Sequence, residues 1–112
     1  MLWFGHLSCT RAYLGSLTLK QALWSVAPDL PMVMFLTGPS SWKQIKETFL
    51  YTMLYKIPHS FLSTVFVPSE YRAIYAGHIF LDIISHTGEW SIQPFFPLNT
   101  TIHGLWNPIA WN

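Results

Sequence analysis

The feature that most constrains this chain is a polar stripe inside an apolar stretch. His78, Asp82 and His86 follow one another at intervals of four residues. On an α-helix they form one tilted stripe, because each step of four advances about 40° around the axis. The residues between them are mostly apolar, and isolated ionisable groups are costly to bury unless they are paired or metal-bound. The pattern therefore indicates one half of a metal site.

The composition limits the classes of protein to which the chain can belong. Charged residues make up 10% of its 112 residues and apolar residues 51%, whereas an ordinary soluble domain has about 25% charged residues. The chain is therefore a membrane protein, an obligate oligomer or an unusually apolar small domain. A net charge of +1 without a basic patch argues against nucleic acid as a partner. The single cysteine, Cys9, excludes an internal disulfide.

The order of apolar runs, caps and breaks predicts an all-α fold, with a single domain over residues 1–112. The length allows one domain with a modest core. We expect about four helical segments, at 1–19, 18–37, 42–67 and 68–87, and then an irregular aromatic and proline-rich tail at 89–112 that ends in a short helix. Thr18 is a typical N-cap for the second segment, and Gly88 is a typical stop signal for the fourth.

Prolines place two further polar side chains at breaks in these segments. Pro28 and Pro31 flank Asp29, and we expect them to end or kink the helix and to hold Asp29 in a partly extended bend. Pro58 directly precedes His59, and it either kinks one long helix or starts a new one. Both positions are suited to present a side chain in a fixed direction.

Histidine and aspartate four residues apart on a helix bring two ligands within reach of one ion. Zinc, manganese or iron accepts such a set, and a hydrolytic site needs at least three protein ligands and one position for water. The residues expected to hold a divalent ion, with zinc as the first choice, are Asp29, His59, His78 and Asp82. Two further histidines, His6 and His86, are expected to complete or orient the site. Glu89 follows the ligand helix by a short turn and is the candidate general base.

Each candidate also has a structural interpretation that the sequence leaves open. His86 suits the free carbonyls at a helix C-terminus, Asp29 suits a turn, and His59 suits an interior position with its hydrogen bonds satisfied. On this view the chain is a small non-catalytic membrane protein whose polar stripe holds helices together. The metal site is favoured because several ionisable groups fall in apolar segments of a chain with few charges.

Several short motifs together resemble the membrane-bound metal-dependent hydrolase family, which consists of small, hydrophobic, mostly helical bacterial proteins. The resemblance spans most of the chain, and its most specific part is the block from His78 to Pro97. The motifs that carry it are Gly5-His6, Ala27-Pro28-Asp29-Leu30-Pro31, His59-Ser60, His78-x-x-x-Asp82, Ser85-His86-Thr87-Gly88-Glu89-Trp90 and Pro94-Phe95-Phe96-Pro97-Leu98. The chain departs from the family pattern in having only Pro58-His59-Ser60 where the family has a longer His-Arg-x-x-x-His-Ser element.

The resemblance implies a function as well as a set of ligands. It implies hydrolysis of an ester or phosphoester, in a lipid or another small-molecule substrate, by a metal-activated water. It also implies that membrane lipid is a partner and that the protein lies in or on a membrane, the bacterial inner membrane being expected. The ligands that it carries over are His6, Asp29, His59, His78 and Asp82, with His86 as a further candidate.

Overall fold

The computed structural model describes residues 3–31, 49–86, 91–98, 100–102 and 104. These residues confirm the all-α prediction: they contain helices and turns, and their only β-type pairing is an isolated bridge between Ile92 and Ile102. In chain order the helices are α1 (Trp3–Leu14), α2 (Leu19–Val26), α4 (Phe49–Tyr51), the π-helical η2 (Thr52–Lys56), the 3-10 helices η3 (Phe61–Phe66) and η4 (Ser69–Tyr71), and α5 (Arg72–Ser85). The expected stop at Gly88 and the short final helix lie outside the described residues.

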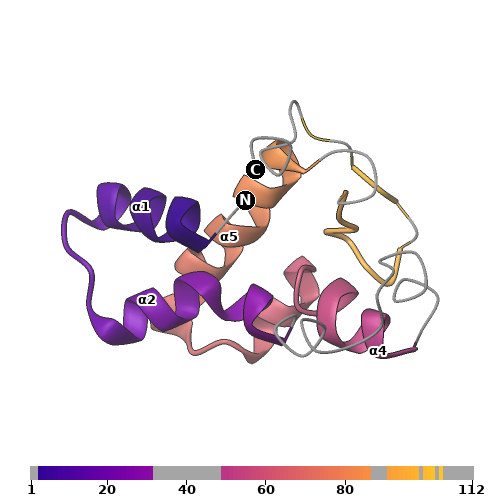
Figure 1. The fold of residues 1–112 in the computed structure, drawn as a ribbon. Helices are drawn as coiled ribbons and strands as arrows, with labels where there is room; N and C mark the ends of the chain where they lie inside the picture. The colour runs from indigo at the N-terminus through magenta and orange to yellow at the C-terminus, as the bar shows by residue number, and fades with distance from the viewer. Residues whose placement is uncertain (1–2, 32–48, 87–90, 99, 103, 105–112) are drawn as a thin grey trace.

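A tight turn folds α1 back along α2. Gly15 ends α1 with a positive φ of 78°, and its N–H donates to the Arg11 carbonyl at 2.8 Å, which is the usual way for a glycine to close a helix. Thr18 then caps α2 in a complete capping box with Gln21, as predicted. The two helices lie side by side, and both contact α5 (Figure 1). This three-helix arrangement brings the N-terminal third of the chain against the polar stripe.

The prolines confirm the sequence prediction only in part: α2 ends at Val26, before Pro28, as expected, but the conformations around the prolines differ. Residues 27–31 continue from α2 as a 3-10 turn and are not partly extended, because the fixed φ of proline also suits helical backbone. Pro58 neither kinks a helix nor starts one, and it lies in a turn at 57–59. Pro58 has no N–H to donate, so the residues on either side of it make the backbone hydrogen bonds of this turn. The N–H of Ile57 donates to Thr52 at 3.0 Å, and that of His59 to Tyr55 at 3.0 Å.

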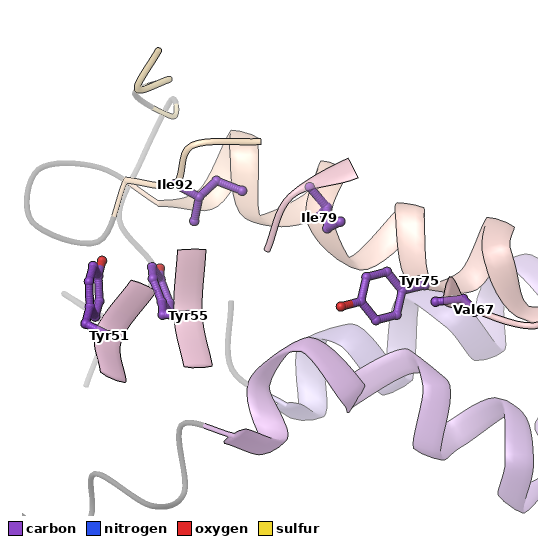
Figure 2. Close-up of a cluster of buried hydrophobic side chains, with 6 residues drawn as sticks. All are labelled: Tyr51, Tyr55, Val67, Tyr75, Ile79 and Ile92. Atoms are coloured by element: carbon purple, nitrogen blue, oxygen red, sulfur yellow. The ribbon is translucent and has the colours of Figure 1, made fainter. Parts of the chain in front are cut away.

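An aromatic and aliphatic core packs α4 and η2 together with α5. Figure 2 shows its six members, which α4, η2, α5 and the segments beside them contribute: Tyr51, Tyr55, Val67, Tyr75, Ile79 and Ile92. Tyr51 and Tyr55 stack with ring centroids 5.0 Å apart, while Tyr75 and Ile79 come from the buried face of α5. The core thus fixes η2 against α5, the two elements between which His59 lies.

The described part of the tail packs back onto these helices. Ile92 is buried in the core, and the Phe61 N–H at the start of η3 donates to the Pro94 carbonyl at 2.8 Å. The Gly104 N–H donates to the His86 carbonyl at 2.8 Å. A Cβ at Gly104 would lie 2.7 Å from the Ile83 carbonyl oxygen, so only glycine fits at this approach to the end of α5.

Candidate metal centre

The buried face of α5 carries the centre of the site. His78 and Asp82 lie one helical turn apart, and Nε2 of His78 is 3.1 Å from Oδ2 of Asp82. The Asp82 side chain is fully buried, although a carboxylate is rarely buried without partners. The four-residue spacing therefore places this pair as the sequence predicts.

His59 reaches the same carboxylate from the turn that follows η2. Its Nδ1–H donates to the Tyr55 carbonyl at 2.9 Å, the same carbonyl that accepts its backbone N–H. Because a carbonyl can only accept, Nδ1 carries a proton, and Nε2 is the ring nitrogen that faces the carboxylates. This Nε2 forms a hydrogen bond with Oδ1 of Asp29 at 3.0 Å and lies 3.4 Å from Oδ2 of Asp82.

His78 is oriented in the same way by α2. Its Nδ1–H donates to the Ser25 carbonyl at 2.7 Å, which leaves Nε2 facing the carboxylates. This Nε2 is buried and has no hydrogen-bond partner within the described part of the chain. Histidines that bind metals almost always hold their other N–H on a carbonyl, a carboxylate or water. Both rings therefore have the tautomer and orientation of metal ligands.

Asp29 closes the site from the 3-10 turn at 27–31. Its Oδ1 lies 3.0 Å from Nε2 of His59 and 3.6 Å from Nε2 of His78. Its side chain is 15% exposed, whereas that of Asp82 is fully buried. Solvent therefore reaches these four residues from the side of the site on which Asp29 lies.

The four side chains could hold one metal ion. One ligand atom from each of Asp29, His59, His78 and Asp82 lies within 4.8 Å of the others. Ligand atoms about 2.0–2.2 Å from a tetrahedral ion lie roughly 3.3–3.6 Å apart, and the four distances between a histidine Nε2 and a carboxylate oxygen in this set are similar, at 3.0–3.6 Å. Two imidazoles and two carboxylates suit several divalent ions, zinc among them.

Two further candidate histidines, His6 and His86, face the other oxygen of Asp82. Nε2 of His86 lies 3.0 Å and Nε2 of His6 lies 3.1 Å from Oδ1 of Asp82. The backbone N–H of His86 also closes α5 by donating to the Asp82 carbonyl at 3.0 Å, so His86 is both the helix end and a neighbour of the carboxylate. The His6 ring, on α1, stacks on His78 with centroids 3.5 Å apart and planes at 10°.

The carboxylates of this cluster stay ionised. Burial raises the pKa of Asp82, but the rings of His6, His78 and His86 offset this effect and hold the pKa well below its usual range. Burial likewise raises the pKa of Asp29, and His59 and His78 lower it further than burial raises it. Two negative charges next to several imidazoles favour a cation at this position.

The two stacked histidines differ in protonation. Burial lowers the pKa of His78, but Asp29 and Asp82 more than offset it and raise the pKa to about 9. Burial also lowers the pKa of His6, and Asp82 offsets this only in part, so His6 stays neutral. Without an ion, the cluster therefore takes up a proton on His78 in place of a metal cation.

Comparison with known proteins leaves this geometry as the main support for a metal site. The chain matches no family model, no curated protein and no solved structure. Among the described residues, no helix combines the length and the apolar character needed to cross a bilayer. The structure brings together His6, Asp29, His59, His78, Asp82 and His86. Glu89, the candidate base, lies outside the described residues.

Sequence reasoning missed the groups that orient the ligands. The Ser25 and Tyr55 carbonyls leave no signal in the side-chain pattern, because every residue has a carbonyl. The Tyr75 hydroxyl, which donates to the Pro58 carbonyl at 2.6 Å, fixes the turn that carries His59. Its position one turn before Ile79 on the buried face of α5 is the only sequence signal that points to it.

Replacing Tyr75 with Phe is expected to lower metal affinity about tenfold, because changes beyond the ligands typically cost 10–100-fold. The affinity can be measured by competition with a chromophoric chelator. Tyr71→Phe, which removes the hydroxyl of another tyrosine packed against the core, is the matched control and should leave the affinity unchanged. Equal affinities for the Tyr75→Phe and intact proteins would show that this hydrogen bond does not position His59.

Proposed function

We propose that this chain is a metal-dependent hydrolase that cleaves an ester or a phosphoester, with zinc as its ion. The observation that carries the proposal is the orientation of His59 and His78. Backbone carbonyls hold both Nδ1 atoms, so both Nε2 atoms face the carboxylates of Asp29 and Asp82. Both Nε2 atoms therefore point towards the region that the two carboxylates share, which is where a cation would bind.

The chain's own residues would divide the work at this site. Asp29, His59, His78 and Asp82 would hold the ion, and the backbone of α2 and η2 would keep both rings in place. A bound zinc ion supplies Lewis acidity, which lowers the pKa of a water to about 7 and polarises the scissile group. Burial of Asp82 excludes solvent from the inner side, so substrate would approach past Asp29, the partly exposed ligand.

A lipid substrate at the membrane surface is part of this proposal. Large aromatic side chains stand out into solvent on α1 and η3: Phe4 and Tyr13 are 82% exposed and Phe66 is 85% exposed. Aromatic side chains are enriched at membrane interfaces, which supports an association with lipid. Co-sedimentation with phosphatidylethanolamine and phosphatidylglycerol vesicles tests it, and protein that stays in the supernatant at low and high salt would contradict it.

The proposal is tested first by metal content. The protein is purified without chelator, bound metal is measured by mass spectrometry, and nitrophenyl phosphates, a nitrophenyl acetate and a phospholipid are then offered as substrates. Metal-dependent turnover that His78→Ala abolishes is the expected result. Absence of bound metal would instead favour the alternative function, a polar stripe that only holds helices together. Bound metal without turnover of any ester would leave a metal site but refute the hydrolase.

The pH dependence of metal binding follows from His78. Its pKa of about 9 means that below that pH an ion must displace one proton from the ring, whereas the carboxylates are already ionised. Affinity should therefore rise about tenfold per pH unit from neutral pH and level off above the His78 pKa. Calorimetry at pH 7 in buffers of different ionisation enthalpy should show about one proton released per ion. No proton release would contradict the protonated state of His78.

A further inference from the structure

The Asp82 carboxylate has a pair of imidazoles at each oxygen. Oδ2 faces His78 at 3.1 Å and His59 at 3.4 Å, and these two rings also face Asp29. Oδ1 faces His86 at 3.0 Å and His6 at 3.1 Å. An ion held by the first set uses only Oδ2, so it leaves unexplained why two more imidazoles converge on Oδ1.

Hydrogen bonding alone does not explain the position of His6. Its ring is shielded from solvent, because the residue is 0% exposed. Among the described residues, neither ring nitrogen has a hydrogen-bond partner. Although Nε2 lies 3.1 Å from Oδ1, its direction does not make a hydrogen bond. Leaving a buried polar atom unsatisfied costs about 1–3 kcal/mol. A cation beside Nε2 would remove that cost for this nitrogen, although not for Nδ1.

The stacked rings of His6 and His78 face different oxygens of the Asp82 carboxylate. The rings are nearly parallel with centroids 3.5 Å apart, and each places its Nε2 3.1 Å from a different oxygen of Asp82. Two parallel imidazoles that face the two oxygens of one carboxylate are therefore arranged for a carboxylate that bridges two ions.

We propose that Asp82 bridges two divalent ions, and that His6 and His86 bind the second ion beside Oδ1. This inference rests on the proposed function, because it assumes that the first ion binds to Asp29, His59, His78 and Asp82. Catalytic zinc sites usually have three protein ligands and an open position for water. The second ion would have three ligands from the chain and would therefore keep such a position.

The number of ions tests the inference. The protein is loaded with Zn²⁺, freed of excess ion by gel filtration and analysed for metal per chain. We expect two ions in the intact protein and one each in His6→Ala and His86→Ala, with hydrolysis lost in both variants although the first ion remains. The control is Thr10→Val, which removes the side-chain hydrogen bond from α1 to Ser25 but no ring nitrogen, and it should bind two ions. Circular dichroism checks that each variant is folded.

A second measurement needs no variant. The intact protein loaded with Mn²⁺ should show the electron paramagnetic resonance of a spin-coupled pair, because a shared carboxylate holds the ions close together. One ion per chain with hydrolysis retained would overturn the second ion and leave the proposed function standing, and no bound ion would overturn both. Two ions with uncoupled signals would overturn the bridge. Two ions in a folded His6→Ala or His86→Ala protein would overturn the assigned ligands.

Discussion

Replacing Asp82 with Asn is expected to remove both stoichiometric metal and hydrolysis. The substitution keeps the size of the side chain but removes the negative charge that faces four imidazoles within 3.4 Å. The loss of affinity should exceed the 10–100-fold that changes beyond the ligands cost, since Asp82 would contact the ion itself. Metal analysis after gel filtration and an assay with added Zn²⁺ measure the two effects.

The matched control lies on the same helix. Phe80 is 58% exposed on the opposite side of α5 from the site, so Phe80→Ala should leave metal content and turnover unchanged. An Asp82→Asn protein that still binds its full complement of metal would show that the ion lies elsewhere. Loss of metal in Phe80→Ala would instead point to a general effect of substitutions on α5.

Removing the metal is expected to lower the midpoint of thermal unfolding by about 10 °C. An ion present at 100 times its dissociation constant stabilises the folded state by about 2.7 kcal/mol. For a domain of this size, each kcal/mol shifts the midpoint by about 4 °C. Scanning calorimetry with and without a chelator measures the shift, and adding Zn²⁺ back in excess should reverse it.

The same scan with His78→Ala provides the control. This variant lacks a ligand, so its midpoint should respond little to chelator or to Zn²⁺. An intact protein whose midpoint is insensitive to both would contradict the metal site, because an ion bound only to the folded chain must stabilise it.

Local spacing predicts the helical half of the site and fails at the other half. The His78–Asp82 pair depends only on helix geometry, which is the same wherever a helix forms. The convergence of Asp29 and His59 depends on how α2 and the turn at 57–59 dock against α5, over a separation of 30 residues. Tertiary packing of this kind has no periodic signal in the sequence. The neighbouring prolines nevertheless indicated that Asp29 and His59 hold their side chains in fixed directions.

The proline conformations show a second limit. Proline fixes φ near −65°, a value shared by extended and helical backbone. Residues 27–31 continue from the end of α2 as a 3-10 turn, so proline alone does not decide the conformation of Asp29. The π-helical hydrogen bond from Ile57 to Thr52 was likewise unpredictable, because such turns have no composition of their own. π-helical turns are frequent at functional sites, and here one lies directly before His59.

The proposed ligands are spread along the chain from His6 on α1 to His86 at the end of α5, and this spread would give a bound metal another consequence. The chain has a single cysteine and so no disulfide within it, yet an ion shared by Asp29 and His59 would join segments 30 residues apart. Closing such a loop costs entropy that grows only slowly with its length. The ion would therefore act as a removable cross-link, and the supply of metal in the cell would set what fraction of this small domain is folded.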